Sequence, residues 1–94
     1  MVAMDTARGR TLEIAKHLYE VGSDGMSVGR LAVLTNQGEN SEKTMLRFLR
    51  KIGAVEVFVE KVGHIKKPPR WRLTKRMNKI YRDIAQKDRG HAEN

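Results

Sequence analysis

The sequence predicts a mainly α-helical fold with a small β-hairpin (α+β), in the order helix, helix, helix, strand, strand, helix. Two observations carry this prediction. Apolar residues recur at helical spacing along the first half of the chain and again after Thr74, whereas they alternate from Val55 to Glu60. Gly53 stands between the helical and the alternating pattern. A two-stranded hairpin is therefore expected between a third and a fourth helix.

The first helix is expected in the stretch TARGRTLEIAKHLYEVG, where Ile14, Leu18 and Val21 share one face. Gly22 follows as a candidate C-cap, and the turn formers Ser, Asp and Gly come next. A second, short helix should start at Ser27, whose hydroxyl can accept a bond from a free backbone N–H, and end at Asn36, which tolerates the left-handed conformation.

The third helix should begin between Gly38 and Ser41 and end at Gly53. Its expected inward stripe is Met45, Leu49 and Ile52, with Leu46 and Phe48 beside it. Lysines and arginines occupy the rest of its surface, so one side is apolar and the other mostly cationic.

The hairpin follows from two alternating segments. Val55, Val57 and Val59 should share one face of the first strand, and Trp71 and Leu73 should point inward from the second. The intervening VGHIKKPP should form the loop, because its two prolines cannot donate backbone hydrogen bonds. Thr74 can cap a last helix that runs to about residue 87.

Composition narrows the classes of function. The 94 residues carry 19 basic and 11 acidic side chains, a formal charge of +8, which favours a polyanionic partner such as nucleic acid. The chain contains no cysteine, so disulfides and thiolate metal sites are excluded. The sequence contains no nucleophile motif and no phosphate-binding loop, and His17, His64 and His91 are not spaced as metal ligands. We therefore expect that the protein is not an enzyme and binds no cofactor or metal.

The stretch LAVLTNQGENSEKTMLRFLRKIGAVEV resembles the helix-turn-helix core of the winged helix-turn-helix superfamily, and RWRLTKRMNKIY resembles the return strand and closing helix of its small MarR, PadR and ArsR-like regulators. Two positions depart from that pattern. Glu42 stands where a buried valine is usual, and Gln37 replaces an apolar turn residue. Either the third helix starts later than in the family, or its N-terminal end packs less tightly.

The resemblance implies a sequence-specific double-stranded DNA-binding protein that regulates transcription, with the third helix in the major groove and the hairpin as a basic wing on the flanking backbone or minor groove. Polar side chains on both elements are the expected DNA-binding residues: Asn40, Ser41, Lys43, Thr44, Arg47, His64, Lys66, Lys67, Arg70 and Arg72. The alternative for the helix and loop cations is an ordinary solvated surface.

The last helix carries an apolar stripe that either packs on its own domain or forms a homodimer interface, as in relatives implied by the resemblance: Met77, Ile80, Tyr81 and Ile84. One domain is expected over residues 7–87, with flexible tails at residues 1–6 and 88–94. No apolar run is long enough to cross a membrane, so we expect a cytoplasmic, nucleoid-associated protein.

Three other functions fit the same sequence. The chain could be a low-specificity DNA-coating, partition or chromatin protein, or a winged-helix protein-interaction module. RNA binding also stays open, although Phe58 is the single candidate for an exposed stacking aromatic.

Overall fold

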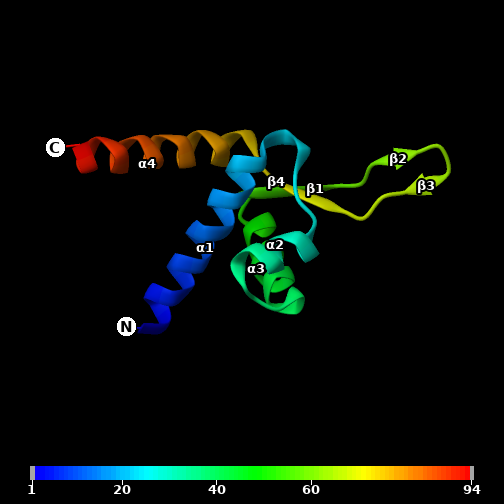
Figure 1. The fold of residues 1–94 in the computed structure, drawn as a ribbon, viewed down its shortest axis with the longest axis horizontal. Coiled ribbons are helices and arrows are strands. Elements are labelled where there is room, and N and C mark those ends of the chain that lie inside the picture. The colour runs from blue at the N-terminus through cyan, green and yellow to red at the C-terminus, as the bar shows by residue number, and fades with distance from the viewer. Residues whose placement is uncertain (1, 94) are drawn as a thin grey trace.

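Four α-helices and an antiparallel β-hairpin make up the fold, in the order that the sequence predicts (Figure 1). The computed structural model describes the backbone of residues 2–93 and the side chains of residues 9–87. The elements are α1 (Val2–Val21), the 3-10 turn η1 (Gly22–Asp24), α2 (Val28–Thr35), α3 (Glu39–Lys51), β1 (Val55–Phe58), β2 (Lys61–Val62), β3 (Ile65–Lys66), β4 (Arg70–Leu73) and α4 (Lys75–Glu93). The predicted tails, residues 1–6 and 88–94, lie outside the residues whose side chains are described.

The hairpin contains two separate ladders. At its root β1 pairs with β4, placing Val55 opposite Leu73 and Val57 opposite Trp71. At its tip β2 pairs with β3. Met26 adds a further bridge, because its N–H donates to Trp71 O (2.8 Å) and its carbonyl accepts from Trp71 N–H (2.7 Å). The root of the hairpin is thus joined to the segment that precedes α2.

The core lies between α1, α2, α3 and the root of the hairpin. Its buried residues are Ile14, Leu18, Leu31, Leu46, Leu49, Ala54 and Val55. Trp71 and Leu73 pack against it from β4, as their alternation predicts. The helices and the inner face of the sheet therefore bury one shared apolar volume.

The expected ends of α2 are confirmed. Ser27 Oγ accepts from Arg30 N–H (3.2 Å) at its start, and Asn36 adopts the left-handed conformation (φ 56°, ψ 43°) after its end. Gly25, just before α2, also needs a positive φ of 71°. A Cβ atom there would lie 2.8 Å from the Phe58 ring and 3.0 Å from Trp71 O, so only glycine lets this turn approach the sheet so closely.

The predicted inward stripe of α3 is partly wrong. Leu49 is buried, but Ile52 is 50% exposed because α3 ends at Lys51 and Ile52 has already left the helix. Phe48 is exposed as well, at 55%. The buried face instead runs through Glu42, Leu46 and Leu49, so a charged residue takes a core position.

Candidate nucleic-acid interface

The exposed face of α3 carries polar and basic side chains. Asn40, Lys43, Thr44 and Arg47 are all exposed, as predicted. Thr44 Oγ1 donates to the backbone carbonyl of Asn40 (3.0 Å), and the Asn40 side-chain amide takes no part in this bond. These residues face away from the core because Leu46 and Leu49 occupy the opposite side of the helix. The helix thus presents hydrogen-bond donors and acceptors along one face from Asn40 to Arg47.

Ser41 is held apart from this face. Its Oγ accepts a bond of 2.7 Å from Arg10 Nη2, and its side chain is half-buried beside α1. The same guanidinium donates to Glu42 Oε1 at 2.7 Å. Arg10 therefore joins the start of α3 to α1 through two neighbouring residues.

The ion pair with Arg10 explains how α3 tolerates Glu42 at a position where the superfamily pattern has a buried valine. Its side chain is 0% exposed, whereas that of Arg10 is 25% exposed. The helix starts at Glu39, so a later start is not the reason. A buried carboxylate needs a cationic partner, and Arg10 supplies it from 32 residues away in the sequence. Glu42 Oε2 and Arg10 Nε are buried without a hydrogen-bond partner, so the pair is not fully satisfied.

A groove of about 600 Å³ connects the basic face of α3 to the hairpin. Lys43, Arg47 and Arg50 line it from α3, and Pro68 and Trp71 line it from the hairpin side. Glu39 is the acidic residue in the lining of this groove. The remaining lining residues are Ser27, Val28, Gly29, Val57 and Pro69. The cations of the helix and the root of the wing therefore belong to one concave surface. Arg50 is one of the basic residues on the cationic side predicted for this helix, but it is not among the predicted DNA-binding residues.

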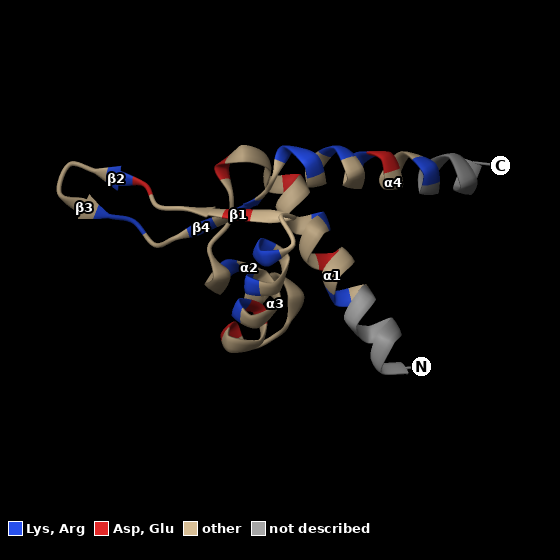
Figure 2. Cartoon of the chain, turned by 180° about the vertical axis from the view of Figure 1, so that it is seen from behind, with Lys and Arg blue, Asp and Glu red and all other residues tan. Residues whose placement is uncertain are grey.

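The wing tip extends away from the helices (Figures 1 and 2). His64 and Lys66 are exposed there, as predicted. Lys61 lies directly opposite Lys66 in the ladder, which puts two like charges on one face of the tip. Lys67 is also exposed, but its Nζ lies 3.7 Å from Glu60 Oε2. Lys61 was not among the predicted DNA-binding residues, although its place in the alternating pattern that begins at Val55 could have indicated it.

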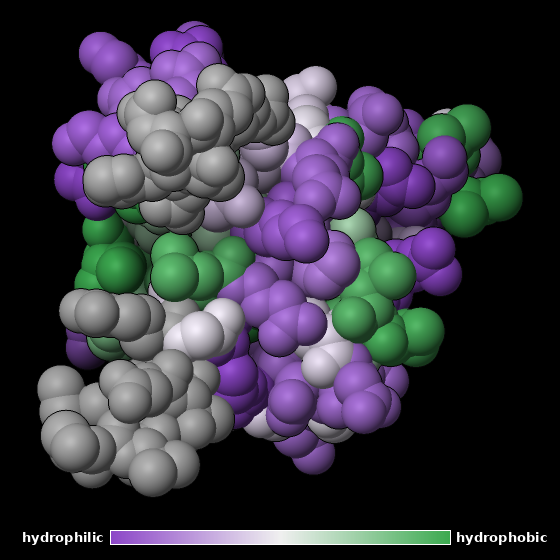
Figure 3. All heavy atoms as spheres, turned by 60° about the vertical axis from the view of Figure 1, so that its left-hand side comes forward, coloured by the Kyte–Doolittle hydropathy of each residue, from purple (hydrophilic) through white to green (hydrophobic). Residues whose placement is uncertain are grey.

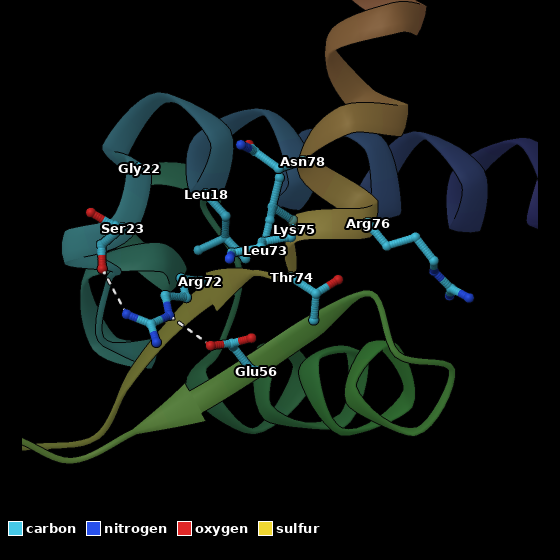
Figure 4. A pocket seen from close by; sticks show the side chains of 10 residues that line it. All are labelled: Leu18, Gly22, Ser23, Glu56, Arg72, Leu73, Thr74, Lys75, Arg76 and Asn78. Carbon is cyan, nitrogen blue, oxygen red and sulfur yellow. Dashed lines mark hydrogen bonds and ion pairs between the residues drawn. The ribbon is translucent and has the colours of Figure 1, made fainter.

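Arg70 and Arg72 bind their own chain. Arg72 Nε donates to Glu56 Oε2 (2.8 Å) and its Nη1 donates to Ser23 O (3.2 Å), as the dashed lines in Figure 4 show. Its guanidinium also lies 4.4 Å from the centre of the Phe58 ring. Arg70 Nη1 donates to Asp24 O (3.2 Å). Both arginines therefore fasten β4 to η1, on the side of the strand opposite Trp71.

The apolar stripe of α4 divides into two pairs. Met77 packs on the core, and the Tyr81 ring lies 5.0 Å from that of Tyr19 on α1. Ile80 and Ile84 stay 42% and 39% exposed. Figure 3 shows hydrophobic surface on the side of the molecule where α1 begins and α4 ends. One pair attaches α4 to its own chain, and the other leaves apolar surface uncovered.

No group of three or more His, Cys, Asp or Glu side chains within the described part of the chain could hold a metal ion. None of the described helices is long and apolar enough to span a bilayer.

Comparison with known proteins finds likeness in structure alone. No known family profile and no curated protein sequence matches the chain. Among solved structures, a variant of ZitR from Lactococcus lactis superposes with a TM-score of 0.68 at 12% identity, over 89% of this chain and 54% of that one. A variant of MepR from S. aureus gives 0.70 at 14% identity, over 88% and 61%. An apo ZitR variant gives 0.66 at 12% identity, over 98% and 68%.

The chain therefore spans little more than half of the first of these structures and about two thirds of the last. ZitR and MepR are MarR-family winged-helix regulators. At such low identity the likeness concerns the fold alone, and it agrees with the four helices and the antiparallel hairpin described above. The chain has a MarR-like winged-helix fold.

Proposed function

We propose that this protein binds double-stranded DNA sequence-specifically and regulates transcription. In this proposal α3 enters the major groove, and the wing tip contacts the backbone or minor groove beside it. The observation that carries the proposal is the groove in which Lys43, Arg47 and Arg50 share one surface with the root of the hairpin. The regulators that share its fold support the same function.

The residues take different roles. Asn40, Lys43, Thr44 and Arg47 are exposed on α3 and have the side-chain types that read base edges. His64, Lys66 and Lys67, with Lys61 added, meet phosphates or sugars from the wing, where contacts fix register more than sequence. Ser41, Arg70 and Arg72 act by holding α3 and β4 in place through the bonds that they make within the chain.

A homodimer completes the proposal. Ile80 and Ile84 leave apolar surface on α4, and pairing two copies through it would place two α3 helices on one duplex. Sedimentation of the wild type at micromolar concentration should then show a dimer, and Ile80→Asp with Ile84→Asp should give a monomer. Only monomer in the wild type would refute this arrangement. Association with the nucleoid would follow from DNA binding.

Selection of bound sites from a random duplex library tests the function directly. We expect an enriched motif with two-fold symmetry and half-sites about one helical turn apart. Arg47→Ala should weaken binding to the selected site by about 1–3 kcal/mol and relax the preference at one position. The exposed cation Lys16 on α1 provides the control, because Lys16→Ala should leave the motif unchanged.

The same selection separates the rival functions. Binding without an enriched motif would favour a DNA-coating or chromatin protein. No binding to any duplex, with retention of an acidic protein, would favour an interaction module. Either result would overturn the sequence-specific regulator.

A further inference from the structure

A second cationic surface lies on α4, outside the groove. Lys75, Lys79 and Arg82 follow one another at intervals of four and three residues, so they occupy one face of the helix. All three side chains are exposed. Within the described part of the chain, these three side chains form no ion pair or hydrogen bond. Residues 75–87 contain five basic side chains and one acidic, a net +4 out of the +8 of the whole chain.

The stripe lies on the face of α4 opposite the residues that pack on the core. Met77 and Tyr81, on the other face of α4, pack on the core and on Tyr19 of α1. Helical periodicity therefore places Lys75, Lys79 and Arg82 on the opposite face, where Lys75 lies nearest to β4. We call these three residues the α4 stripe.

The α4 stripe and the α3 surface are separate. None of the residues that line the groove beside α3 comes from α4. Lys75 instead borders a hollow of about 640 Å³ between η1, β4 and α4, which has no lining residue from α3 (Figure 4). Figures 1 and 2 show α4 on one side of the β1–β4 sheet and α2 and α3 on the other.

We propose that the α4 stripe binds the phosphate backbone of a second DNA duplex, so that the protein joins two DNA segments. The proposal rests on the proposed function for the first duplex, which α3 and the wing bind. The stripe extends along the helix for about 10 Å, from the seven steps between Lys75 and Arg82 at about 1.5 Å each, which allows contact with several phosphates. It consists of long cationic side chains on a convex helix surface, so it contacts the backbone without reading sequence.

The size of the protein makes simultaneous binding physically reasonable. Its two shorter dimensions are 26 and 23 Å. Charges separated by the thickness of the chain lie more than two Debye lengths apart at physiological salt, where one length is about 8 Å. Repulsion between two duplexes on opposite sides is therefore largely screened.

An anionic membrane is a weaker partner for the same stripe. A helix that lies on a bilayer inserts an apolar face next to its basic one. In α4 Met77 and Tyr81 contact their own chain, so only Ile80 and Ile84 among the described residues remain exposed on the apolar face, and the proposed dimer uses both. A rigid phosphate backbone requires only the basic face.

A capture experiment with the full chain tests the proposal. One duplex, carrying a selected site, is fixed to beads; a second, labelled duplex without that site is added with the protein. We expect the wild type to retain the labelled duplex in a salt-sensitive manner. The triple variant Lys75→Gln, Lys79→Gln and Arg82→Gln should retain at least about tenfold less of the labelled duplex, and its affinity for the fixed duplex should be unchanged. Glutamine keeps helix propensity, so the fold should persist.

Two controls separate this inference from the function on which it rests. The reciprocal variant Lys43→Gln, Arg47→Gln and Arg50→Gln should lose the selected site but keep weak, sequence-independent binding through α4. Lys16→Gln, which removes an exposed charge from α1, should capture the second duplex like the wild type.

Each other outcome has a definite meaning. If the wild type binds the fixed duplex but captures no second one, the inference is wrong and the regulator stands. Equal capture by the α4 triple variant would show that two α3 surfaces of a dimer bridge the duplexes, which also overturns it. Loss of phosphatidylserine-vesicle binding in that variant, with DNA capture intact, would assign the stripe to a membrane. A wild type that binds neither duplex would refute both proposals.

Discussion

The buried pair of Arg10 and Glu42 gives the sharpest test of what holds α3 in place. Replacing Arg10 with Met removes the only cation shown within hydrogen-bond distance of Glu42 in the described structure, and leaves a carboxylate that is 0% exposed. Removing one partner of a buried ion pair costs roughly 3–5 kcal/mol. Water reaches a quarter of the Arg10 side chain, so we expect the low end, about 3 kcal/mol.

Thermal unfolding followed by circular dichroism measures this cost. For a domain of this size, 1 kcal/mol lowers Tm by about 4–8 °C, so Arg10→Met should lower it by about 12–24 °C at matched protein concentration. Lys16→Met is the control on the same helix, because Lys16 is exposed, and it should change stability by about 0.5 kcal/mol at most.

The double variant Arg10→Met with Glu42→Met separates the ion pair from simple packing. Two apolar side chains of similar volume should restore most of the lost stability, since such replacements of buried pairs are often neutral or stabilising. A loss below about 1 kcal/mol in Arg10→Met, or a double variant less stable than the single one, would refute the reasoning.

Three more changes probe the turn, the helix cap and the wing. Gly25→Ala should destabilise the fold by about 2–3 kcal/mol in urea unfolding, because the methyl group would meet the Phe58 ring at a positive φ; a neutral result would contradict this. Ser27→Ala should cost about 1 kcal/mol through the lost bond to Arg30 N–H, and no change would show that the cap is unimportant. Lys66→Gln should weaken every duplex alike and reduce the salt slope by about one in a filter-binding titration, whereas a changed motif would place Lys66 on bases.

Much of this fold could be predicted because its determinants are local. The cap at Ser27, the left-handed Asn36 and the alternation that turns Trp71 inward each depend on a few neighbouring residues. The order of elements followed from the change of period at Gly53. The prediction for Ile52 was wrong because a helical stripe applies only while the helix continues. The helix α3 ends at Lys51, one residue before Ile52, so the stripe does not decide which side Ile52 faces.

The site was harder to predict because its bonds are not local. A glutamate on the apolar face of α3 signals a buried partner, but nothing near it in the sequence identifies Arg10. Arg72 has the positive charge expected of a wing residue that contacts DNA. Its guanidinium instead donates to Glu56 on β1 and to the carbonyl of Ser23 on η1. Charge patterns indicate which side chains are cationic, whereas the fold decides which cations remain available.

The break between the two ladders of the hairpin has a consequence for motion. Val59 and Glu60 on one strand and Lys67 to Pro69 on the other separate the root from the tip, and across this stretch Lys67 N–H donates to Glu60 O (3.0 Å). The prolines have no N–H with which to extend the ladder. Residues 61–66 should thus move as a rigid unit relative to the root of the hairpin, with residues 59–60 and 67–69 as the hinge. This motion would let the wing tip adjust to DNA grooves of different width. Nuclear spin relaxation should give them lower order parameters than β1, and equal values would show a stiff arm.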